Sequence, residues 1–433
     1  MTRAGGIVEL KQTVMNRVVV PATLRYFRWR GDPLAGLMTA ETRADPYPLW
    51  DEIRARGDLF HSRLGMWATA DHAAATAILR DQRFSSSPVH QKGYRPPTYP
   101  EGDPRSGMPG PDSLLLTMDP PDHTRIRRLV ASTFSPPAIA ALEPWVRQRT
   151  DALLGGLDPT AGFDLIEDLA LPLPIAVICH LLGVPEEDMD RFRAWGHAAA
   201  TGLEPQVAPD QDPAVVAAEV ELMAYLRDLI DKRRAKSDDS LLSALIAAEE
   251  QGERLSNDEL LATADLLLIA GFETTVNLIG NGTAALIGAP DQWQLLRQDP
   301  DLLPNAVEEL LRYDSPVQAT SRVATEEIAV GGISLPRSAQ VIIALGGANR
   351  DPAEFVEPGR LNVTRSNAGR HLSFSQGIHH CLGAALARLE GRVAIGALTE
   401  RFGRLMLAGP PVRRPLLGLR GYERLPVRCV AGG

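Results

Sequence analysis

The stretch that decides the fold is Phe374-Ser375-Gln376-Gly377-Ile378-His379-His380-Cys381-Leu382-Gly383, which lies between an irregular segment and a long predicted helix. This position puts the Cys381 sulfur at the N-terminus of the helix, where the helix dipole and unpaired backbone N–H groups favour a thiolate. Gly377 and Gly383 permit tight turns and the close approach of a flat ligand. The stretch therefore predicts a cysteine thiolate next to a binding surface for such a ligand.

Two other interpretations of Cys381 stay open on the residues alone. An isolated cysteine is most often a small buried side chain, and this is our interpretation of Cys179 and Cys429. A metal site made of His379, His380 and Cys381 is disfavoured, because adjacent ligands rarely close a tetrahedron and no CxxC pair completes it. Three widely spaced cysteines also argue against a disulfide framework and predict a reducing, cytoplasmic location.

Composition sets the class of protein. The chain has 433 residues, of which 44% are hydrophobic and 5% aromatic, so it can bury a large core built mostly from helices. The formal net charge of -9 argues against a general nucleic-acid binder, which needs a basic surface. No uninterrupted apolar stretch of about 18 residues occurs, so we expect no membrane span.

The hydrophobic pattern predicts one α-rich body with a minor β portion and no linker between independent domains. We expect residues 1–35 to form an N-terminal arm that packs on a single domain of residues 36–433; an amphipathic arm that lies on a membrane surface is the alternative. The loops at 85–110 and 201–213 are rich in Pro. Helices are predicted at 46–57, 71–81, 137–155, 164–182, 186–200, 214–235, 239–250, 257–287, 303–313 and 382–402, and strands at 328–330, 333–335 and 341–343.

The Cys381 stretch resembles the haem-binding loop of the cytochrome P-450 family, whose pattern is Phe-x-x-Gly-x-x-x-Cys-x-Gly. Phe374, Gly377, Cys381 and Gly383 match that pattern, and Ser375 departs from the Gly of many bacterial members. The resemblance implies haem b (iron protoporphyrin IX) with Cys381 as its axial thiolate, held between the long oxygen-binding helix and the helix after the cysteine loop.

A second motif is Ala270-Gly271-Phe272-Glu273-Thr274-Thr275, in the middle of the long apolar helix. Gly, Glu and Thr are poor choices for the centre of a buried helix. A kink with a solvent-facing Glu would explain them. The segment is also similar to the family's oxygen-binding motif, where a local distortion opens a groove for O2 and water. That similarity implies that Thr274 donates a hydrogen bond to the oxygen and that Glu273 helps to deliver protons.

A third motif places Glu309 and Arg312 three residues apart on one helix face. Taken alone, this is an ordinary surface ion pair worth about 0.3 to 0.5 kcal/mol. In the family, the same Glu-x-x-Arg pairs with a second Arg downstream to lock the haem-side core. Arg360, in Pro358-Gly359-Arg360-Leu361, is the residue that we assign to this place.

A fourth motif places His123 and Arg127 four residues apart on a helix that Pro120 and Pro121 open. By itself it describes a solvated basic turn. The resemblance implies that both residues bind a haem propionate, with Arg322 and His379 as further partners. Bidentate Arg suits a buried carboxylate well.

Taken together, these motifs follow the family's order over residues 40–425 and imply a monooxygenase that inserts one atom of O2 into a C–H bond or alkene of a hydrophobic molecule. Pocket walls are expected from the two long loops, residues 266–270 and residues 317–320, and fatty acids, terpenoids or steroids, and polyketide products remain open as substrates. A peroxide-driven haem enzyme and a non-catalytic haem binder are the rival functions; the Glu273-Thr274 pair argues against the first.

Electrons are expected from separate partners, by analogy a ferredoxin and its reductase. No flavin or NAD(P) is expected in this chain, because no G-x-G-x-x-G follows a strand. In this fold Arg125, Arg128, Arg388 and Arg392 would lie near the cysteine side, and a basic patch there would suit an acidic ferredoxin. We expect a monomer in the bacterial cytoplasm.

Overall fold

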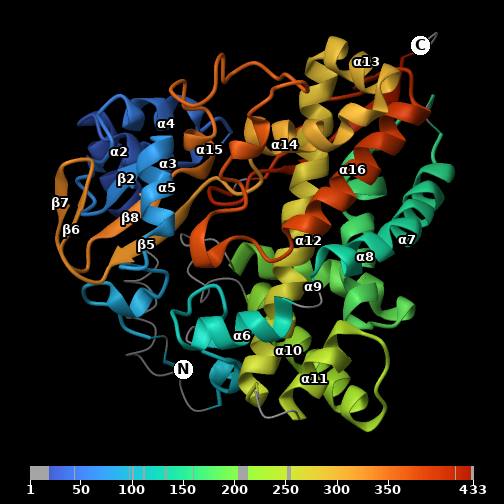
Figure 1. Cartoon of the computed structure of the whole chain (residues 1–433), viewed down its shortest axis with the longest axis horizontal. Helices are drawn as coiled ribbons and strands as arrows, with labels where there is room; N and C mark the ends of the chain where they lie inside the picture. Colours follow the sequence, from blue (N-terminus) through green and yellow to red (C-terminus); the bar gives the residue numbers. More distant parts are fainter. Residues whose placement is uncertain are drawn as a thin grey trace.

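The computed structural model describes residues 19–42, 44–96, 98–99, 102–110, 113–131, 134–158, 160–202, 213–250, 255–414 and 416–430. A helical body, which is built around one long helix, lies beside a smaller part that holds most of the strands and the first helices of the described chain (Figure 1). The largest cluster of buried apolar side chains fills the helical body, and two smaller clusters lie under the main sheet and the N-terminal helices.

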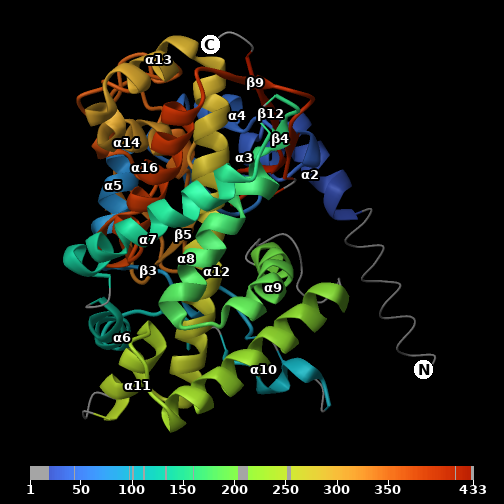
Figure 2. The ribbon, with the colours of Figure 1, turned by 90° about the vertical axis from the view of Figure 1, so that its right-hand side faces the viewer.

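The long helix, α12 (Asn257–Gly288), runs through the helical body in both views (Figures 1 and 2). It starts at a capping box, in which the Ser256 side chain accepts from the Glu259 N–H and the Glu259 carboxylate accepts from the Ser256 N–H. By length and composition α12 could cross a membrane, but 67% of its most apolar window is buried. Because α12 packs against α8 (Pro172–Leu182), α10 (Pro213–Ala235) and α16 (Ala384–Arg401), we assign it as a core helix.

The other helices surround α12 or cover the strands. In Figure 2, α7 and α8 lie on the near side of α12. Their bounds are α2 (Val20–Trp29), α3 (Pro33–Leu37), α4 (Tyr47–Arg54), α5 (His72–Arg80), α6 (Asp122–Ala131), α7 (Pro136–Gly155), α9 (Met189–Gly202), α11 (Leu241–Glu250), α13 (Pro290–Gln298), α14 (Leu303–Tyr313) and α15 (Leu345–Ala348).

The strands of the described residues form one main sheet and three small ones. The main sheet has the order β1-β2-β8-β5-β3; β2 pairs with β8 in parallel and the other pairs are antiparallel. In β8, Val341 and Ile343 are buried, so one face of the sheet packs on apolar side chains. The bounds are β1 (Phe60–His61), β2 (Trp67–Thr69), β3 (Phe84–Ser85), β4 (Phe163–Asp164), β5 (Thr320–Ala324), β6 (Ile328–Val330), β7 (Ile333–Leu335), β8 (Gln340–Ile343), β9 (Leu405–Leu407), β10 (Val412–Arg413), β11 (Tyr422–Arg424) and β12 (Pro426–Cys429).

The prediction of an α-rich body with a minor β portion is confirmed, and most predicted elements are present within a few residues. One predicted helix, 164–182, was wrong as a single element: residues 163–164 form β4, a π-helical turn, η6 (Ile166–Ala170), follows, and α8 then starts at Pro172. Pro at the first helical position explains that start, because the backbone N–H at this position makes no hydrogen bond within the helix and proline lacks that N–H at no cost. Helix α13 was not predicted.

The N-terminal arm is described only in part, because residues 1–18 lie outside the described residues. Helix α2 contacts α3, and the Arg28 guanidinium forms two hydrogen bonds with the Glu52 carboxylate of α4, at 2.6 and 2.9 Å. On the other side of α2, the Trp29 side chain is 78% exposed. The described part of the arm therefore rests on the domain by an ion pair and leaves an aromatic side chain in solvent.

Candidate active site

The cysteine loop has a shape that only particular residues allow. The Cys381 N–H donates to the Phe374 carbonyl at 2.8 Å and closes the loop. Ser375 and Gly377 have positive φ, and a Cβ added at Gly377 would lie 2.3 Å from the Leu79 carbonyl oxygen. Glycine at 377 is therefore required both by conformation and by space. Gly383 has an ordinary φ, and a Cβ there would meet no atom of the described chain within 4 Å.

The sulfur of Cys381 lies just before α16, as the sequence predicts. The residue is solvent-accessible, whereas Cys179 is completely buried. Burial raises the pKa of the Cys381 thiol, and the Gly383 N–H and the guanidinium of Arg127 act in the opposite direction. Burial raises the pKa of Cys179 to about 12. The pKa of the Cys381 thiol is therefore raised overall, and what distinguishes Cys381 from Cys179 is that a ligand can reach it beside Arg127.

Four predicted site residues meet beside this loop. The rings of His123 and His379 lie 4.4 Å apart, between centroids. Arg127 donates to the His380 carbonyl at 2.6 Å, and Arg322 is 5% exposed. Burial, Arg322 and then His123 lower the pKa of His379 to about 3, and burial lowers the pKa of Arg322 to about 10. The structure thus brings residues from α6, β5 and the cysteine loop into one electropositive cluster.

This cluster fits a ligand with carboxylates. Both ring nitrogens of His123 and Nε2 of His379 are buried and have no hydrogen-bond partner in the described part of the chain. No carboxylate of a described residue forms an ion pair with Arg127 or Arg322. Because unsatisfied buried donors are costly, a group with anionic oxygens would be stabilised here. A flat haem with two propionates fits the donors, the accessible sulfur and the open side of Gly383.

Residues 270–275 of α12 lie in an unbroken helix, so the expected local distortion of the oxygen-binding motif does not interrupt α12. The Thr274 hydroxyl donates to the Ala270 carbonyl at 3.0 Å. Ala270 is exposed although α12 is a core helix, so an opening adjoins this side of the helix. A Cβ at Gly271 would lie 2.9 Å from Ile178 Cδ1, which shows how closely α12 and α8 approach each other.

A simple kink would leave the Glu273 side chain facing solvent, but the structure buries it. It is 1% exposed and forms a short ion pair with Arg414, which is 8% exposed and lies between β10 and β11. Arg414 was not predicted, since nothing near it in sequence shows that the C-terminal hairpin reaches the middle of α12. Its only sequence signal is a second arginine in the Arg413-Arg414 pair of a Pro-rich tail.

The assignment of Arg360 to the Glu309–Arg312 network was wrong. Arg360 is 69% exposed and pairs with Glu357 at 3.6 Å. The second arginine is Arg365, whose Nε donates to both carboxylate oxygens of Glu309, at 3.2 and 3.0 Å, while Arg312 binds the same carboxylate at 2.6 and 2.8 Å. The chain turns outward at 357–360 and comes back into the core at Val363, and this return carries Arg365 inward.

Substituting Arg365 by Ala should destabilise the protein by about 3–5 kcal/mol, because it leaves the fully buried Glu309 with one of its two cationic partners removed. The matched control is Arg360→Ala, which changes an exposed side chain and should alter stability by less than about 0.5 kcal/mol. Urea unfolding of both holoproteins measures the difference. Equal losses of stability would show that the network is not as described.

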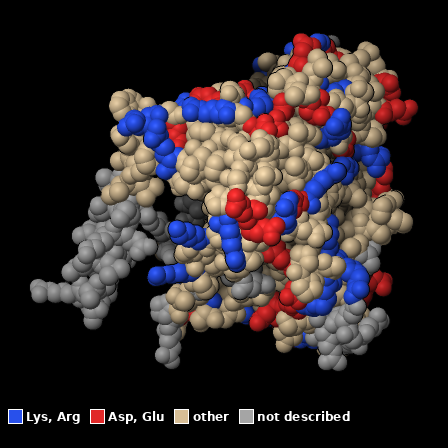
Figure 3. Space-filling model, turned by 60° about the vertical axis from the view of Figure 1, so that its left-hand side comes forward, with Lys and Arg blue, Asp and Glu red and all other residues tan. Residues whose placement is uncertain are grey.

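The predicted basic patch is largely neutralised by ion pairs. Arg388 binds the Glu308 carboxylate at 2.6 and 2.9 Å, Arg392 binds Glu143 at 2.7 Å, and Arg125 pairs with Glu259 at the start of α12. On the face in Figure 3, Lys and Arg side chains are interspersed with Asp and Glu. A hollow of about 350 Å³ adjoins the outside of the cysteine loop and is lined by Arg80, Gly369, His371, Phe374, Ser375, Gln376, Gly377, His380 and Arg388.

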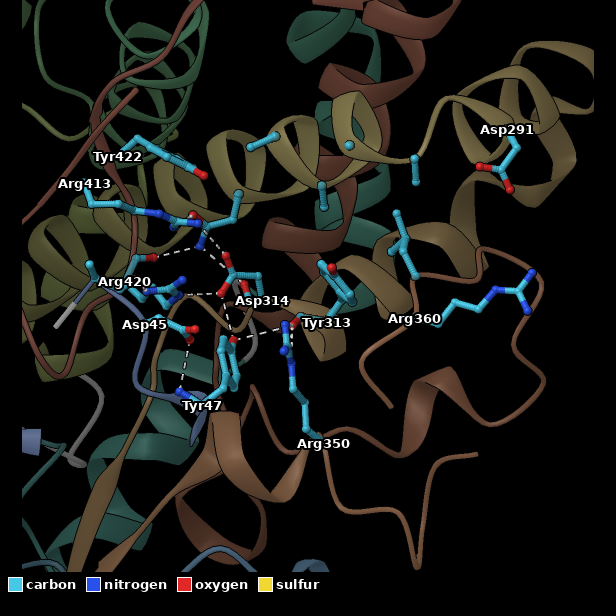
Figure 4. Close-up of a pocket in the computed structure, with 17 residues that line it drawn as sticks. Asp45, Tyr47, Asp291, Tyr313, Asp314, Arg350, Arg360, Arg413, Arg420 and Tyr422 are labelled. Carbon is cyan, nitrogen blue, oxygen red and sulfur yellow. Dashed lines mark hydrogen bonds and ion pairs between the residues drawn. The ribbon is translucent and has the colours of Figure 1, made fainter. Parts of the chain in front are cut away.

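A larger cavity of about 630 Å³ lies at the C-terminal end of α12, and Cys381 is not among the described residues that line it (Figure 4). At its centre the Asp314 carboxylate accepts hydrogen bonds from Tyr47 at 2.8 Å, Arg413 at 3.0 Å and Arg420 at 2.6 Å. These contacts join α4, α14 and the C-terminal hairpin. The cavity is therefore a polar junction that fixes the hairpin, and through it Arg414, rather than the candidate active site.

Comparisons with known proteins agree with this geometry. Residues 210–415 match the cytochrome P450 family model. The chain is 43% identical over 392 residues to the vitamin D(3) 25-hydroxylase of Pseudonocardia autotrophica. The aligned region covers 88% of this chain and 93% of the relative. It is 43% identical over 393 residues to the 6-deoxyerythronolide B hydroxylase of Saccharopolyspora erythraea, with 89% and 96% covered.

The fold is also similar to a solved structure, that of ligand-free CYP164A2 from Mycobacterium smegmatis. The TM-score is 0.82 at 38% sequence identity, and the similarity covers 91% of this chain and 99% of that chain. Relatives with this level of sequence identity and coverage belong to the same family as this chain. The chain belongs to the cytochrome P450 family, and it is a monooxygenase with a haem-thiolate cofactor.

Proposed function

We propose that this chain uses haem b, with Cys381 as axial ligand, to insert one atom of O2 into a hydrophobic molecule, with electrons from a ferredoxin and its reductase. The observation that carries the proposal is the set of buried, unpartnered donors of His123 and His379 beside the accessible Cys381 sulfur. Arg127 and Arg322 complete the set that would bind the propionates. Phe374, Gly377 and Gly383 would shape the loop against the haem face.

When bound, the haem supplies activation of O2 and the oxidising power for oxygen transfer. The protein's residues supply binding, orientation and protons. Glu273 is a buried carboxylate on α12 that is paired with Arg414, and we propose that it relays protons when that pair opens. The neighbouring Thr274 hydroxyl, which donates to the Ala270 carbonyl in this structure, would donate toward the open side of α12 instead. The apolar side chains of α12 around this pair would exclude bulk water from the reaction.

Electrons would arrive at the outside of the cysteine loop. The hollow there is lined by Arg80, His380 and Arg388; Arg388 is paired with Glu308, so Arg80 and His380 are the groups that support docking of a small acidic ferredoxin. Ion pairs make the net positive charge of this surface smaller than the sequence led us to expect. We therefore propose that the binding of ferredoxin depends only modestly on salt concentration. We further propose a cytoplasmic monomer with one domain over residues 36–433, with the arm 1–35 packed on it.

The substrate class is proposed from the relatives and the pocket. One relative is named for vitamin D(3) and another for 6-deoxyerythronolide B, both bulky molecules with large apolar surfaces. In this chain Leu266 and Leu267 are half-buried and Ala270 is exposed, so apolar atoms line the open side of α12. A steroid-like or polyketide-derived substrate is therefore favoured over a linear fatty acid. Most of the predicted pocket loop at 201–213 lies outside the described residues.

The test is turnover of the purified holoprotein with a library of apolar compounds, under isotopically labelled O2 with ferredoxin, reductase and NADPH. The proposal predicts products that carry one labelled oxygen atom and no product when ferredoxin is left out. Activity with hydrogen peroxide but not with ferredoxin would identify a peroxygenase instead. Haem binding with no product from any compound that shifts the haem spectrum would favour a non-catalytic haem protein.

A further inference from the structure

Helix α14 carries two adjacent glutamates that bind different parts of the molecule. Glu309 belongs to the buried network with Arg312 and Arg365, whereas the Glu308 carboxylate binds Arg388 of α16, the helix that follows the cysteine loop. Helices α14 and α16 lie side by side (Figures 1 and 2). Neither the set of residues that we propose to bind the propionates nor the proton-delivery pair includes Glu308.

Three hydrogen bonds fix the Glu308 carboxylate in place. Arg388 donates from Nε to Oε1 at 2.6 Å and from Nη2 to Oε2 at 2.9 Å. Nε2 of His371 lies 3.1 Å from the same Oε2. Because Nδ1 of His371 accepts from the Ser373 N–H at 3.1 Å, the ring proton is on Nε2, and His371 donates to Glu308. The histidine therefore orients the carboxylate that binds Arg388.

The surroundings of this group set its charges. The side chain of Glu308 is 16% exposed and that of His371 is 1% exposed. Burial acts to raise the pKa of Glu308, but the hydrogen bonds from His371 and Arg388 outweigh it and lower that pKa to about 2. Burial lowers the pKa of His371, which agrees with the neutral ring that its hydrogen bonds require. At neutral pH the negative charge of Glu308 therefore compensates the positive charge of Arg388.

The ion pair reaches the cysteine loop through Phe374. Cζ of Arg388 lies 4.5 Å from the centroid of the Phe374 ring, within the range of a cation–π contact. The Phe374 carbonyl in turn accepts from the Cys381 N–H at 2.8 Å. His371, Phe374 and Arg388 also line the hollow outside the loop. The ion pair thus adjoins both the loop that holds Cys381 and the surface where we propose that electrons arrive.

We propose that Glu308 is a positioning residue for electron transfer: it holds Arg388 on Phe374 with its charge compensated, and so sets how readily the haem accepts an electron. In that step one electron leaves reduced ferredoxin and reduces the iron from ferric to ferrous, so the site gains one negative charge and no bond forms or breaks. A cation beside the cysteine loop favours this added charge, and an anion there opposes it. The inference rests on the proposed function, because it requires haem bound at Cys381.

The experiment measures the midpoint reduction potential of the purified, haem-loaded protein by spectroelectrochemical titration without ferredoxin. Glu308→Gln keeps the size of the side chain but leaves the charge of Arg388 uncompensated. The ratio of reduced to oxidised haem at the wild-type midpoint should therefore rise by a factor of about three. Arg388→Gln leaves the charge of Glu308 uncompensated, so it should lower the same ratio by a similar factor.

The double variant Glu308→Gln/Arg388→Gln has the net charge of wild type, so its ratio should return to within about 1.5-fold of the wild-type value. The matched control is Glu143→Gln, which removes a carboxylate that Arg392 binds at 2.7 Å, one turn farther along α16 from the cysteine loop. This variant changes the net charge by the same amount as Glu308→Gln but should alter the ratio by less than about 1.5-fold.

An unchanged ratio in Glu308→Gln, or equal shifts in Glu308→Gln and Glu143→Gln, would overturn the proposal. If Glu308→Gln does not bind haem, Arg388→Gln decides, because its side chain is 39% exposed and its shift has the opposite sign; a ratio that does not fall would overturn the proposal. The reduced carbon-monoxide spectrum is recorded for every variant. A thiolate spectrum with unshifted ratios refutes only this inference, whereas wild type without a thiolate spectrum would refute the proposed function itself.

Discussion

Replacing Glu273 by Gln should lower the rate of product formation by a factor of about 10², with haem content unchanged. A positioned acid–base group contributes about 10² to 10⁴ to a rate, and Gln keeps the size of Glu273 but cannot exchange a proton at neutral pH. Consumption of NADPH and O2 should continue in part and yield hydrogen peroxide. The measurement is the ratio of product formed to NADPH consumed, for wild type and variant.

The ion pair of Glu273 with Arg414 requires a control for stability. Glu273→Gln leaves the nearly buried Arg414 guanidinium without its anionic partner, which by itself destabilises the protein. The double variant Glu273→Gln/Arg414→Gln removes both charges, so it should recover much of the lost stability but none of the lost coupling of NADPH to product. If the double variant recovers the wild-type ratio, Glu273 has a structural role only.

Arg414 acts on the reaction through Glu273 and is a positioning residue. Arg414→Lys keeps a charge but not the guanidinium geometry, so it should couple NADPH to product better than Arg414→Gln does. The pH dependence of the coupling ratio separates positioning from folding, because a purely structural role would leave the shape of that profile unchanged. Product should thus depend on both members of an ion pair that joins α12 to the C-terminal hairpin.

The features that the sequence predicted correctly are those with local causes. The cysteine loop is defined by close sequence neighbours, and the positive φ of Gly377 and its approach to Leu79 explain why glycine is found there. Helix α12 was predicted because its capping residues and apolar run are local as well. The residues that we propose to bind the propionates were assigned through the family resemblance, and the structure shows that His123 and His379 lie close together.

The errors concern contacts between segments far apart in sequence. Arg360 and Arg365 both follow Glu309 at a suitable distance, and only the turn at 357–360 decides which one is buried. Arg414 lies 141 residues from Glu273, and no periodic pattern joins them. The ion pairs in the predicted basic patch were missed for the same reason: its arginines were visible in the sequence, whereas partners such as Glu308 and Glu143 were not.

The second large effect is expected at Cys381. Cys381→Ser replaces the sulfur that we propose as the iron ligand by a hydroxyl, which does not supply a thiolate. Monooxygenase turnover should fall below detection even if haem remains bound by the surrounding His and Arg side chains. Cys429→Ser is the matched control, because Cys429 lies in β12 outside the cysteine loop. It should keep the wild-type rate.

The most direct measurement is the reduced carbon-monoxide difference spectrum of wild type, Cys381→Ser and Cys429→Ser at equal haem content. The account predicts that wild type and Cys429→Ser show the long-wavelength band of a thiolate-ligated haem and that Cys381→Ser lacks it. A Cys381→Ser protein that retains this band would contradict the assignment of Cys381 as the thiolate ligand, and with it the proposed site.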